Sequence, residues 1–434
     1  MRNKMDRGWM MFRRFILLLG ALVIVAVLVF TSPTAAVAQV AQSDQLIIYS
    51  WWTAGEEREA LEALFDLYKQ EYPDVRIVDN PVLGGSGVET KSVMKALILA
   101  GNPPTTFQVH PGGELGFTYV QNNLIAPLTD LWVQEGWSEV YPEAIQELVQ
   151  FNDDFYAVPV NIHRANLVWY NKRIFDQLDL SPPETIDEFF TVMDRLQEAG
   201  IIPLSMASRS KWPAAHAFEV VLLGVGGPEF YLDYFKGEAS ALDPKFIIAL
   251  ETFRRMLRFI NPDHAMLTSG QAASLVRQGK TAMIIMGDWI KGHFDATDWV
   301  AGIDYDMFPF PGTDRVFDLV TDAFAMPKGA PGWELGLEWL KLLGSIEGQV
   351  AFNRIKGSIP ARTDVPLDPF DVIAQRNIED LRMTTLVPSA VHGSAAPDAF
   401  MSDWNDVIII FLYNQDIDLI VRQLESIAKD HGLR

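Results

Sequence analysis

Residues 45–52, Gln-Leu-Ile-Ile-Tyr-Ser-Trp-Trp, form a short apolar run that ends in two adjacent tryptophans. The run predicts a buried strand, and a helical pattern that starts near Glu56-Glu57 follows almost at once. Turns after strands face solvent, where large aromatic rings are costly to leave wet. We therefore expect Trp51 and Trp52 to grip the flat apolar face of a ligand, beside carboxylates that accept hydrogen bonds.

Strand and helix patterns alternate outward from this run. Residues 75–78 and 105–109 predict two further strands, whereas residues 61–68 and 89–100 carry apolar side chains at helical spacing. Such alternation is typical of an α/β lobe with a mostly parallel sheet.

A second, helix-richer lobe is expected further along the chain. Residues 155–160 contain a Val-Pro-Val sequence, and proline blocks ladder pairing, so this stretch suits a strand that leaves the first lobe. Residues 306–311 are again extended and rich in proline, which indicates a return crossing. We predict a first lobe of residues 43–158 plus 306–345 and a second lobe of residues 159–305 plus 346–434.

The first 38 residues have the pattern of an export signal. Residues 1–14 are basic, residues 15–30 are apolar without interruption, and Ala36-Val37-Ala38 offers small residues at signal-peptidase spacing. The apolar run is shorter than the roughly 20 residues that a spanning helix needs. We expect residues 1–38 to be a cleaved signal peptide and the protein to be periplasmic or extracellular, with an uncleaved N-terminal anchor as the alternative.

Composition excludes several classes of protein. The chain has no cysteine, which excludes disulfides, thiolate metal sites and a lipoprotein anchor through cysteine. Its formal net charge of −21 disfavours nucleic acid and anionic membranes as partners. The seven histidines show no metal-ligand spacing. We predict neither a metal nor a cofactor.

Catalytic motifs fail in this sequence. Gly279-Lys280-Thr281 resembles the end of a phosphate loop, but it follows a helical pattern and lacks the earlier glycine. Paired acids such as Glu56-Glu57 could serve a glycosidase. With 56 acidic residues in the chain, such pairs are expected by chance. The sequence therefore favours a binding protein over an enzyme.

Polar and aromatic side chains follow several of the predicted strands. In open α/β sheets ligands bind beyond the carboxyl ends of strands, so side chains at these positions can converge. The residues concerned are Gln108, His110, Asn161, His163, Trp289 and Asp322.

These segments resemble the family 1 extracellular solute-binding proteins of bacterial ABC importers, and within that family the periplasmic glucose-binding proteins. The Trp-Trp, Gln-x-His and Val-His-Gly sequences are together the most specific part of the resemblance. The matching segments run along most of the chain and are residues 49–52, 101–104, 107–110, 158–164, 279–289, 321–322, 326–329, 356–362 and 391–393.

The resemblance implies a two-lobed α/β fold of the periplasmic-binding-protein type II, with a hinge and a ligand cleft between the lobes. It implies a monomer that closes on glucose or a similar monosaccharide and delivers it to the membrane permease of an ABC importer. Indole rings would cover the C–H face of the sugar, while carboxylates, lysine and histidine would bond its hydroxyls. The implied ligand-binding residues are Trp51, Trp52, Glu57, Gln108, His110, Asn161, His163, Trp289, Asp322, Lys356 and His392.

One position departs from the pattern of the family. Ser269 stands where many relatives carry a tryptophan, and Trp212 is a candidate to compensate from a neighbouring loop. The change leaves room for a different monosaccharide or a larger ligand. An oligosaccharide-binding protein of the same fold is therefore the first alternative, and a secreted glycosidase that uses Glu57 and Asp322 as its acid pair is the second.

Overall fold

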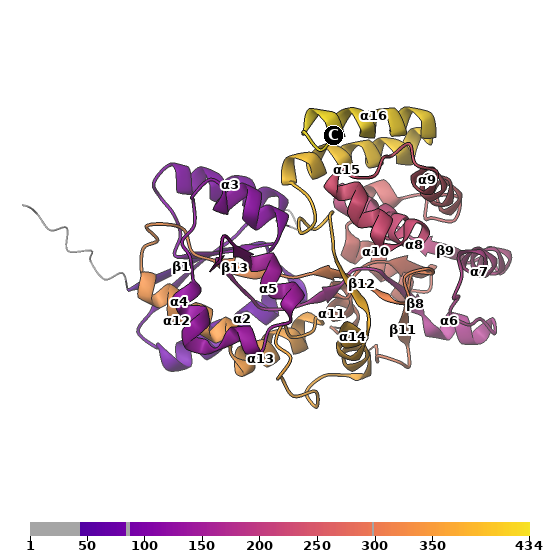
Figure 1. Ribbon diagram of the computed structural model, residues 1–434. Helices are drawn as coiled ribbons and strands as arrows, with labels where there is room; N and C mark the ends of the chain where they lie inside the picture. Colours follow the sequence, from indigo (N-terminus) through magenta and orange to yellow (C-terminus); the bar gives the residue numbers. More distant parts are fainter. Residues whose placement is uncertain (1–43, 84–86, 297–298) are drawn as a thin grey trace, which may run out of the picture. The chain divides into compact units, whose positions relative to one another are not determined.

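The strand predicted at residues 45–52 is β1 (Gln45–Ser50), and it lies inside a five-stranded sheet of order β2-β1-β3-β13-β6 (Figure 1). β1 pairs in parallel with β2 and with β3, and helices connect these strands. The predicted α/β alternation is thereby confirmed. β13 and β6 complete the sheet with antiparallel pairing.

The computed structural model describes residues 44–83, 87–296 and 299–434. The predicted signal peptide and its anchor alternative, residues 1–38, lie outside the described residues. Among the described helices, none is both long and apolar enough to cross a bilayer.

The elements are bounded as follows. The strands are β1 (Gln45–Ser50), β2 (Arg76–Pro81), β3 (Thr106–Val109), β4 (Gln150–Phe151), β5 (Asp154–Phe155), β6 (Ala157–Pro159), β7 (His163–Arg164), β8 (Leu167–Asn171), β9 (Ile202–Ser205), β10 (Thr281–Ile285), β11 (Tyr305–Pro309), β12 (Val316–Val320), β13 (Ala323–Ala325) and β14 (Thr385–Pro388). The α-helices are α2 (Gly55–Glu71), α3 (Val88–Leu99), α4 (Thr129–Glu135), α5 (Glu143–Val149), α6 (Lys172–Gln177), α7 (Ile186–Glu198), α8 (Trp212–Lys236), α9 (Pro244–Met256), α10 (Ser269–Arg277), α11 (Trp289–Asp295), α12 (Trp333–Gly344), α13 (Ile346–Lys356), α14 (Val372–Met383), α15 (Asp398–Asn414) and α16 (Ile417–Asp430).

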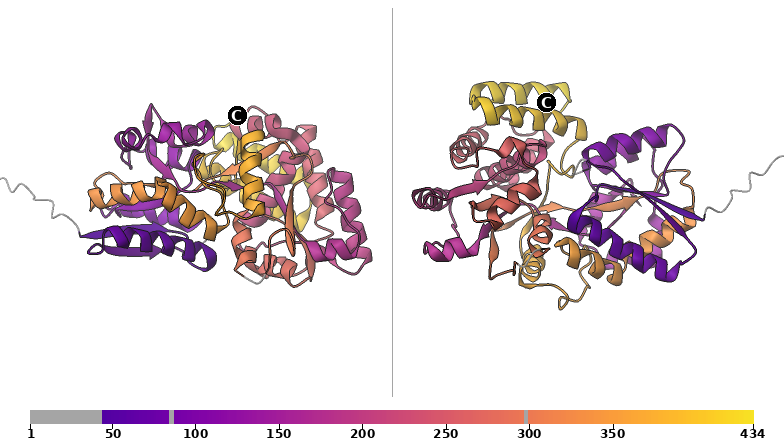
Figure 2. Two further views of the ribbon diagram at one scale, coloured as in Figure 1. Left: turned by 90° about the horizontal axis from the view of Figure 1, so that it is seen from below. Right: turned by 180° about the vertical axis from the view of Figure 1, so that it is seen from behind.

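A second sheet, of order β11-β8-β10-β9, has its own hydrophobic core. The C-terminal helices α15 and α16 pack against α8 and α9 on this core, and the right-hand view of Figure 2 shows the yellow C-terminal pair beside the magenta helices. A smaller apolar cluster includes Trp169, Phe294 and Tyr305. It contains residues of the same sheet that do not belong to the larger core.

The return from the second sheet to the first runs through a different segment from the one predicted. The sequence predicts the crossing at residues 306–311, but residues 305–309 form β11 and pair with β8 at an edge of the second sheet, where a terminal proline is tolerated. The extended segment that leads to β13 is instead β12, which pairs with β7 and β14 in a three-stranded sheet.

The core of the first sheet draws on residues from both ends of the chain. Trp52 packs there with Phe352 of α13, and α13 lies along α2. The left-hand view of Figure 2 shows the orange helices beside the indigo α2. The lobe boundaries predicted from the sequence remain a prediction, although α13 packs with the first sheet.

Candidate functional site

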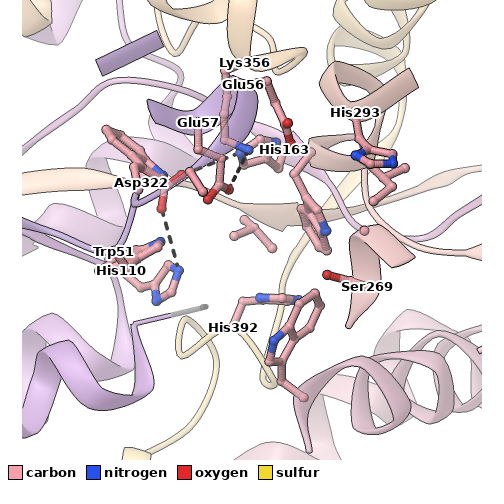
Figure 3. Close-up of a pocket in the computed structure, with 17 residues that line it drawn as sticks. Trp51, Glu56, Glu57, His110, His163, Ser269, His293, Asp322, Lys356 and His392 are labelled. Atoms are coloured by element: carbon pink, nitrogen blue, oxygen red, sulfur yellow. Dashed lines mark ion pairs between the residues drawn. The ribbon is translucent and has the colours of Figure 1, made fainter. Parts of the chain in front are cut away.

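A cavity of about 180 Å³ lies where the ends of several strands and helices meet (Figure 3). Except for Gln108 and Asn161, every predicted site residue lines it. The residues brought together are Trp51, Trp52, Glu57, His110, His163, Trp289, Asp322, Lys356 and His392.

The tandem tryptophans form one wall of the cavity, but neither ring stands in solvent. Trp51 is 5% exposed, and the centre of its ring lies 4.7 Å from that of His110. Trp52 is fully buried, with its ring centre 4.5 Å from Phe352 and 5.8 Å from Phe324. The expectation of a wet turn is therefore wrong, because the turn after β1 is covered by α13 and β13.

Trp289, at the start of α11, stands in a second aromatic wall. Its ring centre lies 4.8 Å from that of His392 and 6.0 Å from that of Trp212. Trp212 and Ser269 both line the cavity, and compensation of the serine by Trp212 stays a prediction. The Nε1–H of Trp289 is buried and finds no hydrogen-bond partner among the described residues, which leaves a donor for a ligand oxygen.

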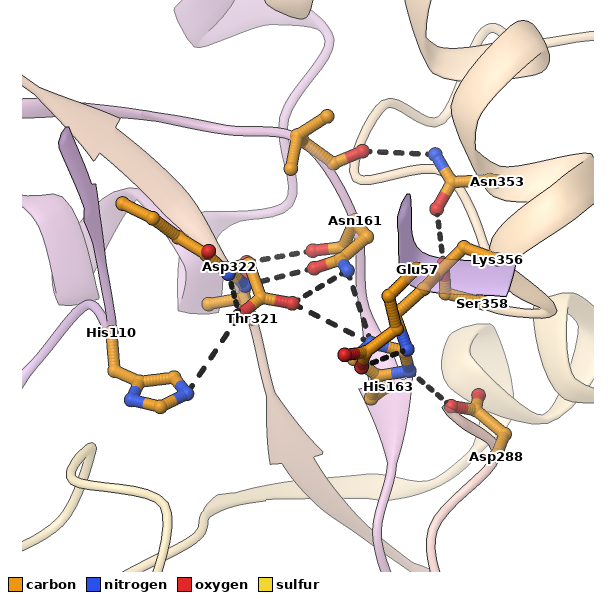
Figure 4. Close-up of polar contacts among 12 residues, drawn as sticks. Glu57, His110, Asn161, His163, Asp288, Thr321, Asp322, Asn353, Lys356 and Ser358 are labelled. Carbon is orange, nitrogen blue, oxygen red and sulfur yellow. Dashed lines mark hydrogen bonds and ion pairs between the residues drawn. The ribbon is translucent and has the colours of Figure 1, made fainter. Parts of the chain in front are cut away.

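Asp322, in the turn between β12 and β13, is the centre of the polar floor (Figure 4). Its carboxylate accepts hydrogen bonds from Gln108 Nε2 at 3.0 Å and from Asn161 Nδ2 at 2.7 Å. Its backbone N–H donates in return to Asn161 Oδ1 at 2.8 Å. Gln108 and Asn161 therefore lie behind the cavity and orient the carboxylate that lines it.

Two histidines face the same carboxylate. His110 Nε2 lies 3.7 Å from one Asp322 oxygen, and His163 Nε2 lies 3.5 Å from the other. Burial acts to raise the pKa of Asp322, but the hydrogen bond with His163 and the charges of both imidazoles outweigh it and hold that pKa below its ordinary value. Asp322 is thus a fixed anionic acceptor.

Lys356, the last residue of α13, is buried and forms an ion pair with Glu57, with 3.1 Å between Nζ and Oε1. Burial alone would lower the pKa of Lys356, but the carboxylates of Glu57, Glu56 and Asp322 raise it above its ordinary value. The ammonium is therefore charged and available to donate to a ligand hydroxyl.

The histidines of the second wall are uncharged at neutral pH. Burial lowers the pKa of His392 well below its ordinary value and lowers the pKa of His216, which lies behind it, to about 3. The two rings approach each other, with 3.4 Å between His392 Nε2 and His216 Nδ1. Neutral imidazoles can accept as well as donate, which suits hydroxyl ligands.

Sequence reasoning missed His293, which lines the cavity, and it noted Glu56 beside Glu57 without including it among the ligand-binding residues. Glu56 precedes a predicted residue and packs on α11: a Cβ added at Gly292 would lie 2.5 Å from Glu56 Cγ and 2.8 Å from the Lys356 carbonyl oxygen. His293 follows Trp289 by four residues on one helix, and that spacing was a usable signal.

No group of three or more histidine and acidic side chains in the described part of the chain is arranged to hold a metal ion. The donors and acceptors of the cavity come from separate segments of the chain between Glu56 and His392, and rings flank them on two sides. The site is therefore suited to a compact ligand that has both an apolar face and a polar rim.

Comparison with known proteins gives relatives along nearly the whole chain. An uncharacterized ABC transporter extracellular-binding protein of Pyrococcus horikoshii is 42% identical over 95% of this chain and 95% of its own length. A probable sugar-binding periplasmic protein of Mesorhizobium japonicum is 33% identical over 87% of this chain and 91% of its own. A glucose-binding protein of Saccharolobus solfataricus is more distant, at 25% identity over 72% of this chain and 59% of its own.

Solved structures confirm the two-lobed α/β fold. One is a bacterial solute receptor described as preferring β-D-galactopyranose, with a TM-score of 0.80 and 18% identity over 89% of this chain and 98% of that chain. The family model for bacterial extracellular solute-binding proteins matches residues 54–350. The chain belongs to the family of bacterial extracellular solute-binding proteins.

Proposed function

We propose that this protein binds a single sugar ring in the cavity and presents it to the permease of an ABC importer. The observation that carries the proposal is the convergence of Trp51, Trp289 and Trp212 with the anionic Asp322 and the cationic Lys356 around one small space. A relative named as a probable sugar-binding protein supports the ligand class.

The chemistry of a pyranose matches these walls. Its C–H face can lie against an indole, with a gain of about 0.5–1.5 kcal/mol beyond area burial. Its hydroxyls donate to carboxylates and accept from ammonium or imidazole groups, and each such bond is strengthened by charge. After the costs of association, a dissociation constant near 1 μM, about −8 kcal/mol, is expected.

The size of the cavity favours a monosaccharide over the oligosaccharide alternative. Its volume of about 180 Å³ is below the range of about 300–1,000 Å³ that is usual for drug-sized ligands. Glucose is the ligand we propose in particular, with galactose and xylose as the competitors that differ by one hydroxyl or one hydroxymethyl group.

Capture and delivery follow from hinge bending. A ligand that contacts both walls stabilises the closed arrangement, because it binds that state better than an open one. We propose that the exported, monomeric protein docks on the permease in this liganded form.

A glycosidase that uses Glu57 and Asp322 as its acid pair finds little support. A general acid must hold its proton near neutral pH, which requires a raised pKa, whereas the pKa of Asp322 is lowered. Glu57 is committed to an ion pair with Lys356.

Isothermal titration calorimetry of the chain from residue 39 against glucose, galactose, xylose and maltose tests the proposal. Micromolar binding of one monosaccharide, with maltose weaker, is expected. Affinities no tighter than millimolar for all of them would refute the proposal, and detectable hydrolysis of aryl glycosides would favour the glycosidase.

A further inference from the structure

Asp288 is a fully buried carboxylate just before α11, next to Trp289. One of its oxygens bonds to Nδ1 of His163, and the other accepts the backbone N–H of Arg164 at 3.1 Å. Its own N–H donates to the Arg164 carbonyl oxygen at 3.0 Å. The turn that carries Trp289 is thus fastened to β7.

The opposite nitrogen of His163 points to the floor of the cavity. Its Nε2 lies 3.0 Å from Asn161 Nδ2, and Asn161 Nδ2 also donates to Asp322 (Figure 4). Since the Asn161 amide oxygen accepts from the Asp322 N–H, the orientation of the amide is set, and its nitrogen must donate to His163. When the ring of His163 is neutral, Nε2 is therefore an acceptor and the ring proton lies on Nδ1. When the ring is protonated, Nε2–H faces the Asp322 carboxylate at 3.5 Å.

We propose that Asp288 is a positioning residue for ligand binding: it holds the proton of His163 on Nδ1, so that Asn161 can fix Asp322 as the acceptor for a ligand hydroxyl. The inference rests on the proposed function, since it assigns the group that sets the polar floor of that site. The series of hydrogen bonds from Asp288 through His163 and Asn161 to Asp322 is called the relay below.

The two bonds of Asp288 explain why a carboxylate is needed. Both oxygens are used as acceptors, one for the Arg164 N–H and one for His163. An asparagine has one acceptor, so keeping the bond from Arg164 would turn its NH2 group toward His163. Nδ1 would then become the acceptor and Nε2 would carry the proton, pointing at the Asn161 N–H. The wrong tautomer in a carboxylate–histidine pair is known to disable a site whose geometry is otherwise intact.

The charged groups around His163 are consistent with this assignment. Asp288 faces it from the start of α11, Asp322 from the β12–β13 turn and Lys356 from α13. Burial acts to lower the pKa of His163, but the Asp288 charge and the hydrogen bonds with Asp288 and Asp322 together outweigh it and raise the pKa above its ordinary value. The His163–Asp288 contact is therefore strong, and the tautomer is to be read at the alkaline end of the His163 titration, where the ring is neutral.

The variant Asp288→Asn, measured on the whole exported chain, tests the proposal. In the ligand-free protein, ¹⁵N NMR of the imidazoles should place the proton of neutral His163 on Nδ1 in the parent and on Nε2 in the variant. Calorimetry against glucose at the same pH should show an affinity loss of about tenfold or more. Asp176→Asn, which removes an exposed carboxylate that pairs with Lys172, is the matched control and should change neither measurement.

A double-variant cycle separates positioning from a structural role. In a His163→Gln background, Asp288→Asn should cost less than about threefold in affinity, because the relay is already cut. An unchanged His163 tautomer in Asp288→Asn, or an equal affinity loss in both backgrounds, would overturn the proposal. If the parent protein bound no sugar, the proposed function would fail, and the NMR result would still decide whether Asp288 sets the tautomer.

Discussion

The Lys356 ammonium and the Glu57 carboxylate join the last turn of α13 to the first turn of α2, with 3.1 Å between them, at the wall of the cavity. Lys356 is buried, whereas Glu57 is partly exposed. The charged ammonium of Lys356 therefore faces the cavity, while the Glu57 carboxylate that pairs with it keeps part of its contact with solvent.

Lys356→Met should weaken the affinity for sugar by about tenfold, since a charge-assisted hydrogen bond contributes about 1.5 kcal/mol. Calorimetry with glucose measures the effect. Lys341→Met, which removes a lysine paired with Glu338 away from the cavity, is the control. Equal affinity of Lys356→Met and the parent would remove Lys356 from the site.

Trp289→Phe should lower the affinity by roughly tenfold while the fold is retained. The variant keeps an aromatic ring but loses the buried Nε1–H that has no partner among the described side chains and backbone. Tryptophan-fluorescence quenching by ligand and calorimetry together check this. Parent-like affinity would show that the N–H does not meet the ligand.

Trp52→Ala should reduce stability as well as binding. Trp52 packs in the first core against Phe324 and Phe352, so its removal leaves a cavity that costs roughly 3–5 kcal/mol of unfolding free energy. Urea unfolding followed by circular dichroism gives this value. A loss below about 1 kcal/mol would mean that the ring is not part of the core.

Trp212→Ala tests whether this ring replaces the missing tryptophan at Ser269. Both residues line the cavity, and Trp212 packs edge-on to Trp289 and His392. We expect the affinity to fall about fivefold, which is about 1 kcal/mol. Trp333→Ala, outside the cavity, serves as the comparison and should bind like the parent.

The neutral histidines His216 and His392 should make stability depend on pH. Burial lowers the pKa of His216 to about 3 and lowers the pKa of His392 well below its ordinary value. The unfolded chain takes up these protons near pH 6.5 and the native state does not, so stability is complete above about pH 6.5 and falls as the pH drops toward the native pKa.

The expected slope is up to about 1.4 kcal/mol per pH unit for each group. Urea melts between pH 7 and 4.5 should show a smaller slope in His216→Gln than in the parent. A parent protein whose unfolding free energy did not fall over this range would contradict the assignment.

The sequence predicted the first sheet because its strands are short apolar runs and its helices have clear periodicity. It misplaced the return crossing, because proline marks an edge strand as readily as a crossing segment, and only the pairing of β11 with β8 distinguishes them. Pairing between segments that are distant in sequence is not visible in local patterns.

For the site, strand ends and motif resemblance identified a set of residues around the cavity. They did not distinguish residues that line the cavity from residues that lie behind it. Nothing local distinguishes Asn161, which orients Asp322 from behind, from His163, which lines the cavity two residues later. No local pattern marks Asp288, since its partners His163 and Arg164 are more than a hundred positions away.

The absence of a side chain at Gly292 sets how near α11 can come to α2 and α13. A methyl group there has no room beside Glu56 and the Lys356 carbonyl at the present spacing. Gly292→Ala would therefore hold the two walls of the cavity further apart. Such a variant would bind sugar through one wall without closing on it. The Gly292→Ala variant thus offers a way to separate ligand binding by one wall from ligand enclosure by both walls.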